Sequence, residues 1–264
     1  GIPNITGAEG SLEPVANALP AWDCIAGNMV ISSLLAAERD RLRSGKGQNV
    51  EFALKDAAAA IVGHLGMIGE ATISDEQRGK SGNSLYGAYG QDFECCCGGR
   101  VIVIGLTLRQ WRGLLKAMDK IDEIKKLEEE LSVSLDDEGR RWVHRHEINN
   151  IFRPWFAKRK ITEFEKGFND LGLTWSQFRT MKEAIDEDGD TFADNPMFET
   201  QDFDGIGKYM VPRSPVEFSN HLAISPEKPP KLGQHTEEIL ADIMGLGSGE
   251  IGVLFDSGIV SFAK

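Results

Sequence analysis

Long apolar runs are missing from this 264-residue sequence, and basic residues are outnumbered by acidic ones. No stretch approaches the roughly 18 consecutive apolar residues of a membrane-spanning helix, so we expect no membrane partner. The net charge is −12, from 29 Lys and Arg against 41 Asp and Glu, and it repels a phosphate backbone. The densest basic cluster is interleaved with acidic residues, as is typical of a solvated helix end, so we expect no nucleic-acid partner. The cluster comprises Arg39, Arg41, Arg43 and Lys46, beside Glu38 and Asp40.

Cysteine is also scarce, and its spacing is wrong for the common cysteine sites. The four cysteines are Cys24 and the run Cys95–Cys97, and no C-x-x-C pair predicts a zinc site. Adjacent cysteines on a strand point to opposite faces and rarely bridge each other. We therefore expect reduced thiols in a cytoplasmic protein.

Motifs for metal binding and for hydrolytic catalysis are missing as well. No set of His, Cys, Asp and Glu has metal-ligand spacing, and the G-x-S-x-G motif is absent. His64 lies in an apolar segment beside Gly63 and Gly66, which favours a buried structural histidine over a ligand. We expect no metal site.

The N-terminal part of the chain has the pattern of an α/β unit. Asp23 is a good N-cap and apolar residues recur at helical spacing after it, which predicts a helix from Asp23 to about Arg43. The glycines of segment 44–47 end that helix. Alternation predicts a short strand over residues 50–54. An almost wholly apolar helix over 56–70, packed deep in a core, follows it.

The rest of the chain alternates between linkers, strands and helices. Residues 72–92 are rich in Gly, Ser, Asp and Asn, as in a linker. Strands over 93–97 and 100–104 are expected to form a hairpin around Gly98 and Gly99. Further helices are expected over 108–118, 121–131 and 137–158, and Thr162 with Glu165 has the spacing of a capping box for a shorter one. Toward the C-terminus we expect a partly helical segment, an extended segment and two helices, at 175–186, 210–218, 235–244 and 248–256.

Asp23 is the first candidate for chemistry. An aspartate at a helix start is usually a cap. Pro20 and Trp22, however, fix and shield the approach to it, and Gly27 leaves the next turn open. A carboxylate held at a helix N-terminus is oriented and usable as a nucleophile, so both interpretations stay open at this point.

The second candidate is the segment Gly82–Gly90, which is rich in glycine and tyrosine. Such backbone either approaches a ligand closely or forms the loop that enters a hairpin. It does not match a phosphate-binding loop, since no Lys-Ser or Lys-Thr pair follows and no strand precedes it.

Four stretches, taken in order and spacing, resemble the family III CoA-transferases, the group that includes formyl-CoA transferase and α-methylacyl-CoA racemase. Gln234 departs from the family, which often has Glu there. The polyglycine loop of formyl-CoA transferase is absent, so a lid of that kind is not expected. The four stretches are Trp22-Asp23 with the helix after it, Ser44–Gln48 leading to Lys55-Asp56, Gly82-Asn83 with Tyr86–Tyr89, and Pro229–Thr236.

The resemblance implies an α/β fold with an incomplete Rossmann-like large domain and a smaller α/β domain. It also implies a homodimer of two interlinked chains, and a fragment whose missing N-terminal part holds most contacts to coenzyme A. The implied boundaries are 1–72 for part of the large domain, 73–92 for a linker, 93–200 for the small domain, 201–219 for a return linker and 220–264 for the C-terminal part of the large domain.

The resemblance further implies which residues form the site. Asp23 matches the catalytic aspartate, and Gly82, Asn83, Tyr86 and Gly87 match a segment expected to bind substrate. No permanently bound cofactor and no metal are implied, because coenzyme A takes part as a portion of the acyl-CoA substrate.

Within the family, three stretches are similar to the members that move CoA between the two carboxyl groups of mesaconate through an aspartyl-CoA thioester. They are Leu19–Asp23, Gly63–Ile68 and Leu85–Glu94. Three alternatives stay open: an intermolecular CoA-transferase, a racemase whose His partner lies upstream of Asp23, and an inactive fragment.

Overall fold

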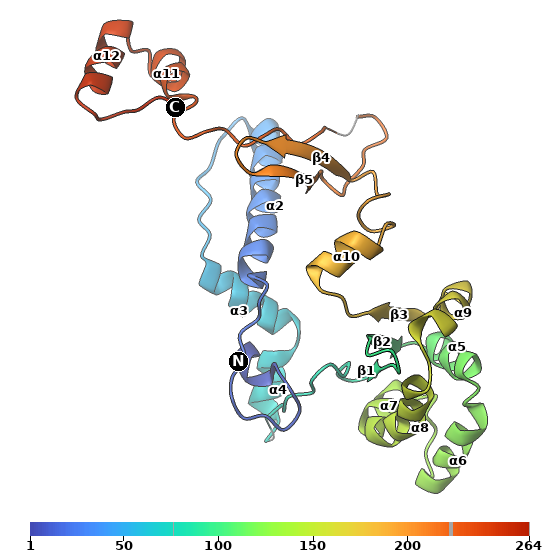
Figure 1. Cartoon of the computed structure of the whole chain (residues 1–264). Coiled ribbons are helices and arrows are strands. Elements are labelled where there is room, and N and C mark those ends of the chain that lie inside the picture. Colours follow the sequence, from blue (N-terminus) through green and yellow to red (C-terminus); the bar gives the residue numbers. More distant parts are fainter. Residues whose placement is uncertain (76, 222–223, 264) are drawn as a thin grey trace. The chain divides into compact units, whose positions relative to one another are not determined.

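The computed structural model describes residues 1–75, 77–221 and 224–263. The chain divides into two compact units, Gly1–Phe178 and Arg179–Lys264, whose elements are labelled in Figure 1. The predicted return of residues 220–264 to residues 1–72 remains a prediction.

The first unit begins with four helices. They are α1 (Ile2–Ile5), α2 (Ala21–Ser44), α3 (Leu54–His64) and α4 (Met67–Ile73), and α2 is the long blue helix of Figure 1. The predicted end of α2 is confirmed, because Gly45 takes a left-handed conformation (φ 73°) and its N–H donates to the Arg41 carbonyl.

The beginning of α2 differs from the prediction. The helix starts at Ala21 with Pro20 at the N-cap position, so Asp23 is the third helical residue rather than the cap. Proline favours a helix start because its φ is already close to the helical value, and this local preference sets the first turn three residues earlier than an aspartate cap at Asp23 would.

The strand predicted over 50–54 is wrong, and so is the single buried helix over 56–70. Residues 45–53 form no regular structure, since a strand needs a neighbouring backbone and none of the described strands pairs with this segment. Gly66 has a φ of 76° and separates α3 from α4. Of α3 and α4 only Ala57 is buried, and His64 is exposed rather than enclosed in a core.

The predicted hairpin is confirmed, with longer strands. β1 (Tyr89–Glu94) and β2 (Arg100–Gly105) pair antiparallel, with Tyr89 opposite Gly105 and Glu94 opposite Arg100. β3 (Thr174–Gln177) pairs antiparallel with the other side of β2, so Trp175 lies on a strand and not in the helix that was expected to begin there.

Helices cover this sheet (Figure 1). α5 (Leu108–Met118) packs on β2, and α8 (Arg145–Ala157) packs on β1. α6 (Ile121–Leu131) has its predicted bounds, whereas the single helix expected over 137–158 is two helices, α7 (Glu138–Val143) and α8, which meet at His144.

The predicted Thr162/Glu165 capping box is also wrong. A 3₁₀ turn, η1 (Ile161–Glu163), precedes α9 (Glu165–Asp170). The Glu163 carboxylate accepts a hydrogen bond of 2.5 Å from the backbone N–H of Lys160. This carboxylate therefore caps the 3₁₀ turn and not α9.

One hydrophobic core holds the sheet and these helices together. Phe93 stacks on Phe156 with ring centroids 4.7 Å apart, and Tyr89 meets Trp111 edge-on. Every buried member of this core lies between residues 89 and 168, so the described helices α1–α4 add nothing to it. Its members are Tyr89, Phe93, Cys95, Val101, Val103, Trp111, Leu114, Leu115, Met118, Ile124, Leu127, Leu135, Ile148, Phe152, Trp155, Phe156, Ile161, Phe164 and Phe168.

The second unit contains α10 (Met181–Glu187), the antiparallel pair β4 (Phe198–Phe203) and β5 (Gly207–Pro212), α11 (Thr236–Glu238), the π-helical η2 (Ile239–Ile243) and α12 (Ser248–Asp256). The extended segment predicted from Met210 is strand only to Pro212, whereas α12 has its predicted bounds. Gly233 has a φ of 78°, and a Cβ there would lie 2.7 Å from the Ser261 carbonyl oxygen, so only glycine lets the C-terminal segment pass.

Candidate active site

Asp23 lies in the first turn of α2 and is exposed. Its carboxylate forms no hydrogen bond or ion pair with any side chain in the described part of the chain. The first turn also places it near helix N–H groups that have no partner within the helix, which favours a negative charge. An accessible carboxylate that is not engaged elsewhere is what a nucleophile requires.

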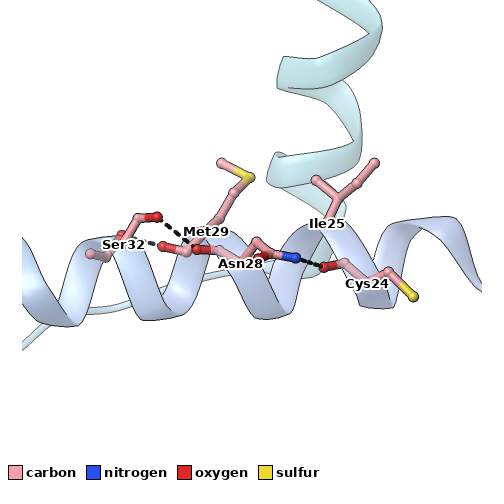
Figure 2. A pocket seen from close by; sticks show the side chains of 6 residues that line it. Cys24, Ile25, Asn28, Met29 and Ser32 are labelled. Carbon is pink, nitrogen blue, oxygen red and sulfur yellow. Dashed lines mark hydrogen bonds between the residues drawn. The ribbon is translucent and has the colours of Figure 1, made fainter. Parts of the chain in front are cut away.

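A shallow groove of about 490 Å³ runs along α2 from Cys24, the residue after Asp23 in the sequence. Figure 2 shows the side chains that line it. Along it, the Asn28 amide donates to the Cys24 carbonyl at 2.9 Å, and the Ser32 hydroxyl donates to the Asn28 carbonyl at 2.8 Å. All of its lining residues belong to this one helix, so the groove is open and needs a second wall to enclose a ligand. The lining residues are Cys24, Ile25, Asn28, Met29, Ser32 and Ser33.

The two predicted substrate-binding glycines occupy left-handed turns. Gly82 has a φ of 59° and Gly87 a φ of 80°. The N–H of Gly82 donates to the carbonyl of Gly7 at 3.0 Å, which ties the 81–84 turn to the N-terminal segment. Because residues with a Cβ rarely adopt this conformation, the glycines are required by the backbone whatever else they do.

Tyr86 is the centre of a stack of alternating cations and rings. The Arg78 guanidinium lies 3.9 Å from the centroid of its ring, and the Trp142 ring lies 5.0 Å away. Arg145 in turn lies 4.1 Å over Trp142, while the Tyr86 hydroxyl donates to Glu70 at 3.4 Å. With Arg78 and Trp142 both against its ring, we infer that Tyr86 fixes the linker to α7 and α8.

Asn83 lines a polar cavity of about 560 Å³, called the Asn83 cavity below. Its walls come from the N-terminal segment, the 81–84 turn, β1 and α8. Of the predicted site residues, Gly82 and Asn83 line it, whereas Tyr86, Gly87 and Asp23 do not. The full lining is Thr6, Gly7, Ala8, Glu9, Ser81, Gly82, Asn83, Ser84, Gln91, Asp92, His146, Asn149 and Arg153.

A chain of hydrogen bonds forms one side of the Asn83 cavity. The buried Tyr89 hydroxyl donates to Asn149 Oδ1 at 2.9 Å, and the Asn149 amide donates to Gln91 Oε1 at 3.2 Å. The hydroxyl of Ser84 donates to the same Gln91 oxygen at 2.6 Å, and Gln91 Nε2 donates to Asp92 at 2.8 Å. Burial also raises the pKa of Tyr89 well above its ordinary value, so this hydroxyl keeps its proton.

Asp92 and Glu9 carry the negative charge of the cavity, and both are paired with cations. Burial raises the pKa of Asp92, but hydrogen bonds from Arg100 (2.5 Å) and Asn83 outweigh that effect and hold the pKa below its usual value. Glu9 accepts from Arg145 at 2.6 Å and lies 3.3 Å from His146. These contacts likewise outweigh its burial and lower its pKa.

Sequence reasoning missed most of the polar residues of this cavity. Gln91 and Asp92 were placed in a linker, whereas both belong to β1 (Tyr89–Glu94), whose sequence does not alternate between apolar and polar residues. Asn149 and Arg153 are four residues apart on α8 and share a helix face. No local pattern marks them, because the face that looks toward β1 is set by tertiary packing.

The described residues contain no group of three or more His, Cys, Asp and Glu side chains placed to hold a metal ion. All four cysteines are free thiols, with Cys95 buried and the others exposed. In the described part of the chain, no helix combines the length and apolar character that crossing a membrane requires.

Comparison with known proteins identifies the family. The family model described as CoA-transferase family III matches residues 1–236. The chain belongs to CoA-transferase family III. The resemblance seen in its motifs is thereby confirmed, and the α/β fold class agrees with that of solved family members.

Within CoA-transferase family III, the chain is similar to proteins of several named activities. It is 44% identical over 261 residues to 2-methylfumaryl-CoA isomerase of Chloroflexus aurantiacus, covering 99% of the chain and 64% of that protein. It is 24% identical to succinyl-CoA:glutarate CoA-transferase of Mus musculus, covering 98% of the chain and 57% of that protein. The chain therefore spans less than two thirds of the length of both relatives.

A solved structure shares the fold. The crystal structure of a CaiB/BaiF family protein from Brucella suis superposes with a TM-score of 0.67 at 20% sequence identity, covering 92% of the chain and 60% of that protein.

Proposed function

We propose that this chain is part of an enzyme that moves CoA between the two carboxyl groups of mesaconate, converting 2-methylfumaryl-CoA to 3-methylfumaryl-CoA. The observation that carries the proposal is the 44% identity to 2-methylfumaryl-CoA isomerase across nearly the whole chain, against 24% to a transferase with separate donor and acceptor acids.

Asp23 is the proposed nucleophile. Its carboxylate attacks the thioester carbonyl, the C–S bond breaks, and CoA leaves as a thiolate while a mixed anhydride forms. The thiolate then attacks the Asp23 carbonyl, which releases the mesaconate dianion and leaves an aspartyl-CoA thioester. The other carboxylate of mesaconate attacks this thioester, and the same two steps in reverse place CoA on the second carboxyl group.

The local structure supports this role for Asp23. A carboxylate engaged by a cation or by its own helix backbone would have to leave that partner before it attacked. Asp23 is exposed and caps nothing, and its carboxylate has no side-chain partner in the described chain. The groove along α2 supplies one wall of a site. We propose that the second wall comes from the other chain of an interlinked homodimer.

Three other functions make different predictions. An intermolecular transferase needs a second acid as acceptor, and the relatives named for succinyl-CoA and glutarate represent that class. A racemase uses Asp23 for proton transfer and forms no acyl-enzyme. A non-catalytic fragment retains the fold without turnover. We also propose a cytoplasmic location and no permanently bound cofactor, with CoA present only as part of the substrate.

One assay separates these functions. A full-length form containing this chain is incubated with 2-methylfumaryl-CoA and no added acid, and the products are separated by chromatography. Formation of 3-methylfumaryl-CoA supports the proposal, whereas turnover only after adding a second carboxylic acid supports the intermolecular class.

Trapping adds a test of the covalent step. Hydroxylamine or borohydride added during turnover modifies an aspartyl anhydride or thioester but leaves a free carboxylate unchanged. Peptide mapping is expected to place the modification on Asp23, and a modification elsewhere would identify a different nucleophile.

A further inference from the structure

We propose that the Asn83 cavity is an anion subsite in which Arg153 binds a carboxylate of the free dicarboxylic acid. This inference rests on the proposed function for the identity of the acid, and it concerns binding rather than the covalent step.

Arg153 is the cation of the cavity that has no anionic partner. It lines the cavity from α8, and no carboxylate of the described residues lies within ion-pair distance of its guanidinium. The charged neighbours are already matched, since Arg145 pairs with Glu9 and Arg100 pairs with Asp92. The guanidinium is therefore available to bind an incoming anion.

The chemistry of an arginine matches that anion. Its planar fork of N–H groups binds a carboxylate through two parallel hydrogen bonds. The cavity volume of about 560 Å³ lies within the range of small-molecule sites, and a five-carbon acid fits such a volume. The hydrogen-bonded chain from Tyr89 through Asn149 to Gln91 holds the neighbouring side chains of the cavity in place, so little reorganisation is needed on binding.

Charge balance favours a carboxylate over a phosphate of coenzyme A. Glu9 and Asp92 both line the cavity, and their pairing leaves one uncompensated positive charge, that of Arg153. A singly charged carboxylate matches it, whereas a doubly charged phosphate would lie near two acidic side chains with one charge unmatched.

The test is direct binding of mesaconate to a full-length form containing this chain, measured by isothermal titration calorimetry. Arg153→Met is expected to weaken binding about 10-fold or more, the loss of a charge-assisted hydrogen bond, while Arg153→Lys weakens it less because the charge remains. Arg140→Met is the matched control, since Arg140 is an exposed arginine on α7 that does not line the cavity. Circular dichroism shows whether each variant is folded.

Hydrogen exchange locates the bound acid. With mesaconate present, protection is expected in the 81–84 turn and in residues 146–153 of α8. No binding by the wild-type chain, equal affinity of wild type and Arg153→Met, or protection confined to other segments would each overturn the subsite. Loss of coenzyme A binding instead of mesaconate binding in Arg153→Met would assign the cavity to a phosphate and overturn the carboxylate.

These binding measurements, combined with the isomerisation assay described above, separate this inference from the proposed function. Mesaconate binding that depends on Arg153, in an enzyme that fails to isomerise 2-methylfumaryl-CoA, leaves the subsite standing and rejects the reaction. Isomerisation by an enzyme whose mesaconate binding does not depend on Arg153 supports the reaction and rejects the subsite.

Discussion

The N-cap of α2 lies at Pro20, three residues before Asp23, and this correction changes the design of an experiment on Asp23. As an N-cap, Asp23 would have linked catalysis to helix stability, so that Asp23→Ala would confuse the two. Because Pro20 holds the cap position, Asp23→Ala removes only a first-turn charge, which contributes about 0.3–1 kcal/mol.

We predict that Asp23→Asn in the full-length enzyme removes nearly all isomerisation, since a neutral amide is a poor nucleophile. Thermal melting of both Asp23→Asn and Asp23→Ala should stay close to wild type, and the initial rate with 2-methylfumaryl-CoA measures activity. A folded Asn variant that turns over at the wild-type rate would remove Asp23 from the chemistry.

The glycines of the 81–87 segment give a second prediction for single residues. Gly82→Ala and Gly87→Ala are each expected to destabilise the chain by about 1–2 kcal/mol, because a Cβ is strained at positive φ. Urea unfolding measures the change. Gly167→Ala is the control: it lies inside α9, where a Cβ meets no atom within 4 Å, and alanine should stabilise that helix by about 0.5–1 kcal/mol. Equal effects at all three positions would contradict this explanation.

Among the elements, the helices with strong local signals were predictable and the isolated strands were not. α5 begins at a complete capping box between Thr107 and Gln110, so its bounds follow from adjacent residues. β3, in contrast, is four residues long and forms only because β2 offers a free edge, which no local pattern reveals. The predicted strand over 50–54 has no such partner, so residues 50–53 stay irregular and Leu54 begins α3.

The site followed the same division. Gly82 and Asn83 could be named as candidates because a family motif carries them, and both line the Asn83 cavity, while their role in binding substrate stays a prediction. Arg153 could not, because its position in the cavity depends on how α8 packs against β1. Residues brought in by tertiary packing have no spacing in the sequence by which to be found.

The β1–β2 hairpin carries a pH-dependent element. Asp92 lies diagonally across from Arg100 in the register, and its side chain is 8% exposed. Its folded-state pKa is lowered from 3.8, so the pair contributes its full stability above that value and loses it as the pH falls through the lower folded-state pKa.

We predict that Asp92→Asn lowers the free energy of unfolding by about 1–3 kcal/mol at neutral pH, and that the difference from wild type shrinks as the pH falls below 3.8. Urea unfolding across pH measures it. Glu94→Gln is the control, because this 67%-exposed carboxylate meets the same Arg100 at 3.5 Å and should have little effect. A difference that persists unchanged into acid would rule out the ion pair as its cause.

For the whole molecule, the main feature is the uneven distribution of apolar surface. The core of the first unit is confined to the β1–β3 region, while α2 exposes a set of large apolar side chains. They are Val30, Ile31, Leu34, Leu35 and Leu42. Contiguous apolar surface of this kind usually marks an interface or an aggregation hazard.

We predict that the 264-residue chain binds a hydrophobic dye or aggregates, and that it does not sustain full activity by itself. Dye fluorescence and light scattering measure the surface. The triple variant Ile31→Gln, Leu34→Gln, Leu35→Gln should reduce both signals without loss of the β1–β3 core. A monodisperse, dye-silent and fully active preparation of the wild-type chain would contradict this prediction.

The accessibility of the three consecutive cysteines indicates when the β1–β2 hairpin opens. Burial, with smaller effects of Cys97 and Cys96, raises the pKa of Cys95 to about 11, whereas hydrogen bonds from backbone N–H groups lower that of Cys97. A colourless disulfide reagent that releases a dye should therefore react at once with the exposed thiols of Cys24, Cys96 and Cys97. It should react with the buried thiol of Cys95 only when β1 separates from the core. The rate of the slow phase would measure how fast β1 separates from the core while the rest of the fold stays intact.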